Sequence, residues 1–426
     1  MNHMLRIASI VLLLGLAPRV HADVVPGDIV DASNVETVAD LVSPAIEWCV
    51  RNGMTMKIVE PKPITWPQVY VAATEKYAGQ VRLAENGLAL EGHVAGAPFP
   101  NVDTKDPAAA VKIMWNYEYR PFPGTDDFVE YDFPADTGAV GQGTPMDVER
   151  RYWIGESRRL YYNARLRIDP KPELPNPDGI RFKEVLGPLV APFDLKGIGA
   201  LSYRYIDAAQ QDDTWLYVPT LRRVRRLSTA QRSDALFGQD TDPDSYWGYN
   251  GHIAWSDWKF LGEKEMLGVL HGEHYPMQRC PGASDFLFCD AWEKRTMYVV
   301  EGVSKLPQYA YGKRVIFIDK ESMVVSYSDI YDRNHELWKV WIDNHQFKRS
   351  AFPGATVYDE EKDFYAGLTM VDMQLLHATY VPHPGPKPAR HEGWHFDSGA
   401  GSATKYKPSG GMPASFSVAK LIEQGQ

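Results

Sequence analysis

This sequence contains few cysteines and no long apolar run beyond its N-terminus, and its basic residues are outnumbered by acidic ones. Its 426 residues include only three cysteines, and beyond the N-terminus no segment stays apolar for 18 residues. These absences exclude a disulfide-dense miniprotein and a polytopic membrane protein. The formal net charge is −10, so bulk electrostatics give no reason to expect a nucleic-acid partner.

Aromatic side chains, by contrast, are abundant. Phe, Trp and Tyr make up 12% of the chain, which favours β-rich structure with large cavities or clefts. The hydrophobic share of 44% and the charged share of 23% are ordinary for a folded soluble protein. The length allows two or three domains and leaves ample chain for a buried core.

The N-terminus has the pattern of a cleaved signal peptide. A short basic segment, Met1–Arg6, precedes an apolar run, Ile7–Ala17, and small residues around Ala22 suit a signal peptidase. Eleven apolar residues are too few for a permanent membrane span. We therefore predict a cut after Ala22 and an exported protein of the periplasm.

The predicted export to an oxidising compartment allows the cysteines to form disulfides. Cys280 and Cys289 flank the turn sequence Pro281–Asp285, which could bring them together as a disulfide in an oxidising compartment. Two buried thiols are the alternative. Cys49 follows Trp48 and is predicted to be a core residue and not a nucleophile.

Helical signals are confined to the N-terminal part. One helix is predicted over 34–50, and another begins at Thr65, where Thr-Trp-Pro-Gln has the form of a capping box. The apolar period then changes to two. Residues 111–119 and 160–168 alternate between apolar and polar types and are predicted to be half-buried strands.

Further strands are predicted along most of the remaining chain, whereas 121–146 and 169–179 have the composition of loops. Strands in series with few helices between them favour a β-dominated α+β fold with a large antiparallel sheet. The strand candidates lie at 200–206, 214–221, 256–262, 296–303, 313–319, 322–328 and 335–343. We divide the chain into a signal peptide (1–22), an N-terminal helical and strand region (23–146), a sheet region (147–381) and a Pro-, Gly- and His-rich tail (382–426).

The tail contains a metal-site pattern. His391-Glu392-Gly393-Trp394-His395 matches His-Glu-x-x-His, which binds zinc in proteases when a helix places both imidazoles on one face. The internal glycine and the surrounding prolines disfavour that helix. We therefore favour a surface tail and expect neither enzymatic activity nor a cofactor, with a metal-dependent hydrolase as the alternative.

The densest charge run lies at 221–227. As a strand it would carry arginine on both faces, which fits a sheet edge. The functional interpretation is a contact with a partner or a lipid headgroup, and the alternative is a solvated edge. The four arginines are Arg222, Arg223, Arg225 and Arg226.

This run also carries a resemblance to a known family. The stretch 213–227, DTWLYVPTLRRVRRL, resembles the LolA/LolB-like outer-membrane lipoprotein-sorting proteins, in which a Trp-x-Tyr-x-Pro strand often leads into an Arg-rich segment. Stretches within 238–246 and 313–339 are similar to the same family. The segments 73–81, 94–100 and 112–116 resemble a narrower proteobacterial family of exported proteins of unknown function.

The resemblance implies a fold and a cargo. The fold would be a curved antiparallel half-barrel with covering helices, an N-terminal extension and an irregular C-terminal tail. The cargo would be a lipid or another hydrophobic molecule. The implied partners are an inner-membrane exporter of the resistance-nodulation-division type and an outer-membrane component.

The leading hypothesis is therefore a periplasmic carrier or chaperone that binds its ligand in the half-barrel. Strands with an aromatic face suit a curved sheet around an apolar ligand. A ligand-free scaffold of an envelope complex, with a packed core, is the other alternative. Cavity candidates taken from the strand faces are Trp115, Tyr117, Tyr162, Tyr203, Trp215, Tyr217, Phe317 and Trp338.

Overall fold

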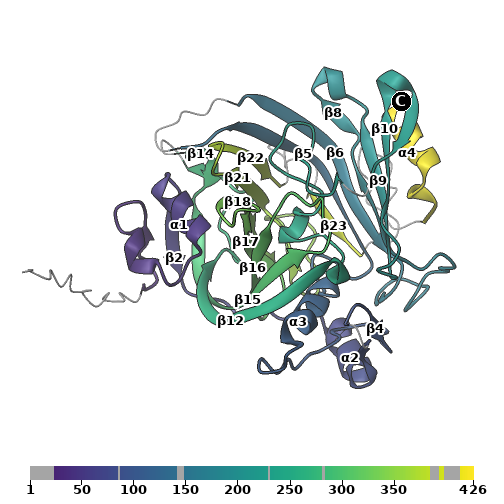
Figure 1. The fold of residues 1–426 in the computed structure, drawn as a ribbon, viewed down its shortest axis with the longest axis horizontal. Coiled ribbons are helices and arrows are strands. Elements are labelled where there is room, and N and C mark those ends of the chain that lie inside the picture. The colour runs from purple at the N-terminus through teal and green to yellow at the C-terminus, as the bar shows by residue number, and fades with distance from the viewer. Residues whose placement is uncertain are drawn as a thin grey trace, which may run out of the picture.

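The computed structural model describes residues 24–84, 87–141, 148–228, 231–280, 284–383, 393–397 and 413–426. The predicted signal peptide and the turn at 281–283 lie outside these residues. Within the described part, seventeen strands join in one large curved sheet and few helices accompany it (Figure 1). The predicted β-dominated α+β class is confirmed. No helix in the described ranges is long and apolar enough to cross a membrane.

The main strands follow one another across the sheet as antiparallel neighbours. In order they are β11 (Arg223–Arg226), β10 (Asp213–Val218), β9 (Gly199–Tyr205), β7 (Ile180–Leu186), β6 (Arg150–Tyr161), β5 (Asp127–Ala139), β22 (His377–Pro382), β21 (Gly367–Asp372), β18 (Leu337–Asn344), β17 (Val325–Tyr331), β16 (Lys313–Asp319), β15 (Asp290–Ser304) and β12 (Ser256–Gly268). Among the described residues the edge strands β11 and β12 do not pair with each other, so the sheet stays open.

One pairing departs from the predicted antiparallel sheet. β2 (Met56–Val59) runs parallel to the start of β15, and β1 (Ile29–Val30) pairs with β2, so the sheet is mixed. The predicted antiparallel sheet is therefore correct for the main strands and wrong for the pairing of β2 with β15. The region predicted to be a loop at 121–146 also contains β5, which pairs with β6 across the expected boundary at 146/147.

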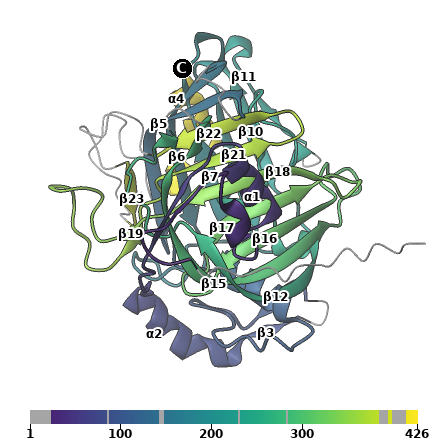
Figure 2. The same cartoon turned by 90° about the vertical axis from the view of Figure 1, so that its left-hand side faces the viewer.

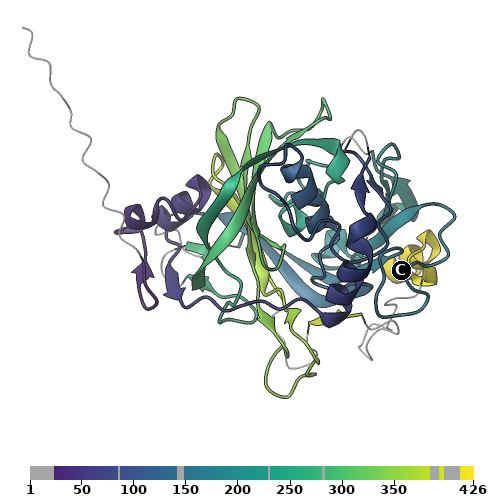
Figure 3. The same cartoon turned by 90° about the horizontal axis from the view of Figure 1, so that it is seen from below.

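The segment 111–119 is a helix and not the predicted strand. It forms most of α3 (Ala109–Glu118), which packs on the inner face of the sheet against Tyr298, Val300 and Ile316. Figure 3 shows α3 within the curve of the sheet and α1 outside it. Because α3 is buried on nearly all sides, its sequence lacks the one-sided apolar stripe that identifies a surface helix.

The strand predicted over 160–168 ends early, because β6 stops at Tyr161. Two buried charged side chains hold the following turn. The Arg165 guanidinium donates to the Tyr161 carbonyl at 2.8 Å, and the Asp126 carboxylate accepts the Leu166 and Ile168 N–H groups, each at 2.7 Å. These bonds replace the sheet bonds that a strand would make.

The helix predicted over 34–50 is divided into a short 3-10 turn, η1 (Val35–Val38), and α1 (Pro44–Arg51), and α1 covers the outer face of the sheet. It lies across β16, β17 and β18 (Figure 2) and buries Ile46 and Cys49 against them. Cys49 is fully buried as predicted, and burial raises the pKa of its thiol. The other predicted helix, α2 (Gln68–Tyr77), begins without a side-chain cap, so the capping-box prediction is wrong.

The C-terminal tail is more ordered than predicted. α4 (Val418–Gly425) packs on the outer face of β9 and β10 through Leu421, and β23 (Trp394–Phe396) pairs with β5. The expected irregular, superficial tail is therefore wrong for these segments. The predicted disulfide between Cys280 and Cys289 is confirmed.

A buried aspartate anchors the start of α1. The Ser43 hydroxyl accepts the Ile46 N–H at 3.2 Å and donates to the carboxylate of Asp329 in β17 at 2.7 Å. Asp329 is fully buried. Burial raises the pKa of Asp329 to about 7, although the bonds from Ser43 and the Ala45 N–H oppose this rise.

We expect Asp329→Asn to flatten the pH dependence of stability. With a pKa of about 7 in the folded state and about 4 when unfolded, Asp329 favours folding most at low pH and loses this contribution as the pH rises through 7. The loss reaches about 4 kcal/mol. Urea unfolding between about pH 4 and pH 8 measures it. The free energy of unfolding of Asp329→Asn should increase relative to that of the wild type as the pH rises. The same quantity for Asp359→Asn, a change at an exposed position, should follow the wild type at every pH. Parallel curves for Asp329→Asn would contradict this.

Candidate functional site

An apolar cavity of about 400 Å³ lies on the inner face of the sheet. Its floor is formed by the inward-facing residues of β5, β6, β7, β9 and β10, because alternate residues of a strand share a face. Residues from 227–228 and 231–250 form its roof. The apolar floor residues include Phe133, Ala135, Ile154, Phe182, Leu186, Ala200 and Leu216, and Trp341, Leu368, Val381 and Trp394 complete the wall.

Buried ion pairs fix the roof to the sheet. Asp212, just before β10, accepts two bonds from Arg204 at 2.6 and 2.8 Å and one from Arg232 of the roof at 2.6 Å. Burial by itself would raise the pKa of Asp212, but the two arginines outweigh it and lower the pKa to about 2. Arg232 also pairs with Asp244. The carboxylate of Asp212 therefore stays ionised at neutral pH and ties Arg232 of the roof to Arg204 of the sheet.

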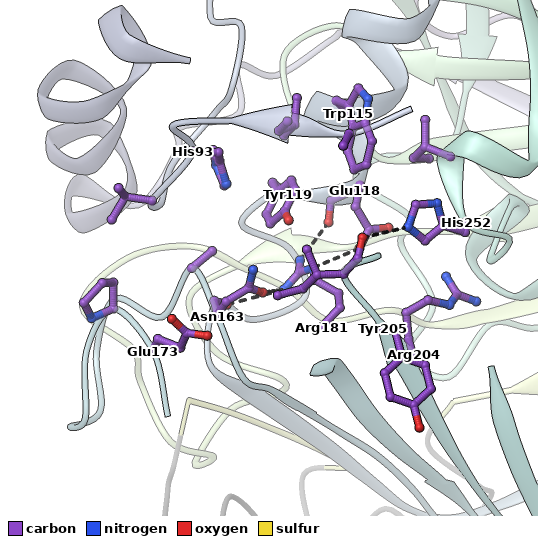
Figure 4. Close-up of a pocket in the computed structure, with 17 residues that line it drawn as sticks. His93, Trp115, Glu118, Tyr119, Asn163, Glu173, Arg181, Arg204, Tyr205 and His252 are labelled. Atoms are coloured by element: carbon purple, nitrogen blue, oxygen red, sulfur yellow. Dashed lines mark hydrogen bonds and ion pairs between the residues drawn. The ribbon is translucent and has the colours of Figure 1, made fainter. Parts of the chain in front are cut away.

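A second, polar cleft of about 340 Å³ shares Arg204 with the apolar cavity. Figure 4 shows its central ion pair, in which Arg181 of β7 contacts Glu118 of α3 and Asn163. Arg181 Nε lies 3.0 Å from Glu118 Oε1, and Nη1 lies 3.1 Å from Asn163 Oδ1. Burial raises the pKa of Glu118, but Arg181 and neighbouring cations lower it further than burial raises it.

The histidines of the polar cleft are uncharged at neutral pH. Burial lowers the pKa values of His93 and His252 to about 4. The His93 ring packs on Tyr119 with 4.1 Å between ring centroids, and His252 makes an edge contact with Trp115. Neutral rings and paired charges suit a structural link between α3 and the sheet better than acid–base chemistry near neutral pH.

The predicted cavity aromatics lie elsewhere. Tyr203 and Trp215 contact each other on the outer face, where the Tyr203 hydroxyl donates to the Phe416 carbonyl beside α4 at 2.9 Å. None of the eight lines the apolar cavity. Tyr162 and Tyr217 belong to the same outer cluster, and Phe317 lies under α1. Tyr117 is part of α3 and belongs to the core cluster between this helix and the sheet, and Trp115 lines the polar cleft. The Trp338 indole N–H donates to the Asp372 carboxylate.

The structure therefore corrects the choice of strand face. The cavity is lined by the residues between the predicted aromatics, such as Ser202, Thr214 and Leu216. Period-two alternation could identify both sets of residues but could not say which set faces inward. The amphipathic C-terminal segment 418–425 could have indicated that the aromatic face is the outer one, because this segment packs on that face and covers it.

The predicted arginine contact lies on an edge strand. β10 and β11 form a hairpin, here called the arginine hairpin, and the side chains of Arg222, Arg223, Arg225 and Arg226 are exposed on it. Arg226 pairs with Asp213. Arg225 lies opposite Leu216 in the register and thus shares the face that forms the cavity floor.

The histidine motif of the tail is only partly described. His391 and Glu392 lie outside the described residues, and His395 lies in β23, which is extended and not helical. Trp394 and Phe396 on either side are buried in the core. Within the described ranges no three His, Cys, Asp or Glu side chains gather closely enough to hold a metal ion.

The fold and the cavity together define the class of this protein. It is a β-dominated α+β protein whose curved sheet forms an apolar cavity under a roof held by ion pairs. The chain belongs to the DUF1329 family, proteins of unknown function, whose family model matches residues 29–409. None of the curated proteins matches the sequence.

Several solved structures are similar to this chain at low identity. A domain from Vibrio parahaemolyticus named for outer membrane lipoprotein sorting is 15% identical, with a TM-score of 0.49 over 74% of this chain and 100% of that one. A DUF1329 protein from Desulfovibrio piger is 14% identical, with a TM-score of 0.44 over 74% and 99%. A LolA superfamily protein from Nitrosomonas europaea is 13% identical, with a TM-score of 0.36 over 64% and 90%. At these values the function has to be inferred from the cavity itself.

Proposed function

We propose that the protein is a periplasmic carrier or chaperone that binds a lipid or another hydrophobic molecule in the apolar cavity. The cavity on the inner face of the sheet carries this proposal. Its volume of about 400 Å³ lies in the range of small-molecule sites, and its lining is mainly hydrophobic. Burying hydrocarbon there stabilises a complex by about 0.8 kcal/mol per methylene.

Binding, and not catalysis, is the role we propose for this cavity. The arginines close to the cavity are engaged in ion pairs with neighbouring carboxylates. Arg204 and Arg232 share Asp212, and Arg159 pairs with Glu184 at 3.0 Å. These pairs hold the roof and the floor in place and require no bond to be made or broken in the ligand.

We also propose that the arginine hairpin is the delivery contact and that it meets an anionic membrane surface. Two turns expose apolar side chains here, one of them beside the hairpin and the other at its tip. Phe193 in η3 (Phe193–Leu195) is 93% exposed and Leu221 in η4 (Pro219–Leu221) is 47% exposed. The two turns are adjacent, because Gly197, two residues after η3, lies so close to Pro219 of η4 that a Cβ atom at position 197 would contact the proline ring. Figure 1 also shows β8 (Leu189–Ala191) and β10 at the same end of the molecule. Clustered cations beside exposed apolar residues suit an anionic lipid interface.

The position of the hairpin connects the two proposals. Leu227 directly follows β11 and lines the cavity, so Arg223 and Arg225 lie at its rim, on the same strand face. A ligand leaving the cavity past this rim would enter the surface that the arginines contact. We propose that this transfer serves an envelope transport system with a resistance-nodulation-division type exporter.

Native mass spectrometry of the mature protein, purified from its own periplasm, tests the carrier function. We expect a bound species of lipid-like mass that organic solvent releases and that lipid analysis then identifies. Denatured protein from the same preparation gives the reference mass. A protein at bare sequence mass that also fails to bind added apolar probes would contradict the carrier and favour a ligand-free scaffold.

A further inference from the structure

A buried polar pair, His383 and Glu130, lies among the aromatic residues of the cavity wall, apart from the arginines that hold the roof. His383 follows β22 and its backbone N–H donates to the Ala366 carbonyl at 2.9 Å, which fixes its position. Its ring lies against Phe133, Tyr365 and Trp394, with centroid distances of 4.7, 5.3 and 5.9 Å. Only 4% of His383 is exposed, and it lines the cavity.

Glu130 of β5 occupies one side of this ring. Its carboxyl group bonds Nδ1 of His383, and Glu130 also lines the cavity while being only 1% exposed. Nε2, the other ring nitrogen, is buried and has no hydrogen-bond partner among the described residues. A buried polar atom without a partner costs about 1–3 kcal/mol. The aromatic rings around His383 offer no group that would remove this cost.

The pair also limits the charge of a ligand. Burial lowers the pKa of His383 to about 3, so the ring is uncharged at neutral pH. The neutral ring of His383 therefore offers no positive charge to an anionic headgroup, and Arg204 and Arg232, the arginines of the cavity lining, are already paired with Asp212. A hydroxyl group can both donate and accept, so it matches Nε2 whichever ring nitrogen carries the proton.

We propose that the ligand of the cavity is an apolar molecule with an uncharged hydroxyl group, and that this hydroxyl bonds Nε2 of His383. The inference rests on the proposed carrier function and names its ligand class. The rest of the cavity would bury the hydrocarbon part. His383 and Glu130 would determine the orientation of the molecule, with its hydroxyl at β5 and β22.

Two probes of equal size test this. 1-Decanol and 1-fluorodecane differ only in the terminal substituent, a hydroxyl group against a fluorine atom, and each is titrated as a competitor of the fluorophore N-phenyl-1-naphthylamine. The measured quantity is the ratio of their dissociation constants in the wild type divided by the same ratio in His383→Phe. We expect His383 to favour the alcohol by about 10-fold in this comparison.

Control variants separate the hydroxyl contact from a general change in the cavity. Phe133→Leu alters the neighbouring wall and should change both affinities equally. His383→Leu provides a smaller replacement if His383→Phe does not fold, and should also lose the preference. Decanoate should bind the wild type more weakly than decanol does.

Each result has a distinct meaning. If neither probe binds the wild type, the carrier function itself fails, and this inference fails with it. If both probes bind and the ratio is the same in wild type and variants, the carrier function stands and the hydroxyl contact is wrong. Stronger binding of decanoate than of decanol would also overturn it.

Discussion

Replacing Ala200 with phenylalanine should weaken the binding of an apolar probe by about 100-fold. Ala200 lies in β9 opposite Leu216 of β10 and Leu186 of β7, and all three line the cavity. The added ring would therefore stand where ligand hydrocarbon binds. Displacing three to four methylenes costs about 3 kcal/mol, which corresponds to that factor in the dissociation constant.

The measurement is a fluorescence titration with N-phenyl-1-naphthylamine. Ala200→Ser is the matched control, because it changes the same position but leaves the cavity open, and it should bind nearly as well as the wild type. Thermal unfolding of both variants verifies that they remain folded. If Ala200→Phe binds the probe as tightly as Ala200→Ser, the cavity is not the binding site.

Reversing three charges on the arginine hairpin should abolish binding to anionic vesicles. The triple variant Arg222→Glu, Arg223→Glu and Arg225→Glu leaves the Arg226–Asp213 pair intact, so the hairpin keeps its own ion pair. Each basic side chain near an anionic surface contributes about 1 kcal/mol. Losing three should therefore reduce the partition coefficient at least about 100-fold, and high salt should weaken the wild-type binding as well.

Vesicle flotation measures this effect, using phosphatidylcholine with and without about one-third phosphatidylglycerol. A control variant with Lys105, Lys259 and Lys264 changed to glutamate carries the same net charge but leaves the hairpin unchanged, and these lysines are exposed in other parts of the protein. It should bind like the wild type. Equal loss in both variants would reveal a bulk charge effect, and no loss in the hairpin variant would contradict the membrane contact.

Signals that depend on close neighbours in the sequence predicted their elements well. The strand pattern at 313–319 coincides with β16, and that at 200–206 overlaps β9. The pairing of Cys280 with Cys289 required only a short turn between them. Elements failed where distant partners decide the outcome: α3 is buried on nearly all sides, and the turn at 162–168 depends on Asp126.

The cavity itself was beyond prediction for the same reason. His383 and Glu130 are 253 positions apart in the sequence, and no motif connects them. Arg204, Asp212 and Arg232 lie closer together, but their charges alone do not indicate that they fix a roof over the sheet. Such sites become recognisable only when the strands are placed side by side.

The sequence by itself determined that this chain folds into a β-rich sheet, which cysteines pair, and where its arginines cluster at an edge. These properties follow from period-two alternation, turn residues and local charge. Only the tertiary structure decided which face of the strands forms the cavity. Tyr203 reaches Phe416 beside α4 across 213 positions, and this distant cover turns the aromatic face outward. Alternation is the same whichever face is inside, so the choice belongs to the partner that packs on it.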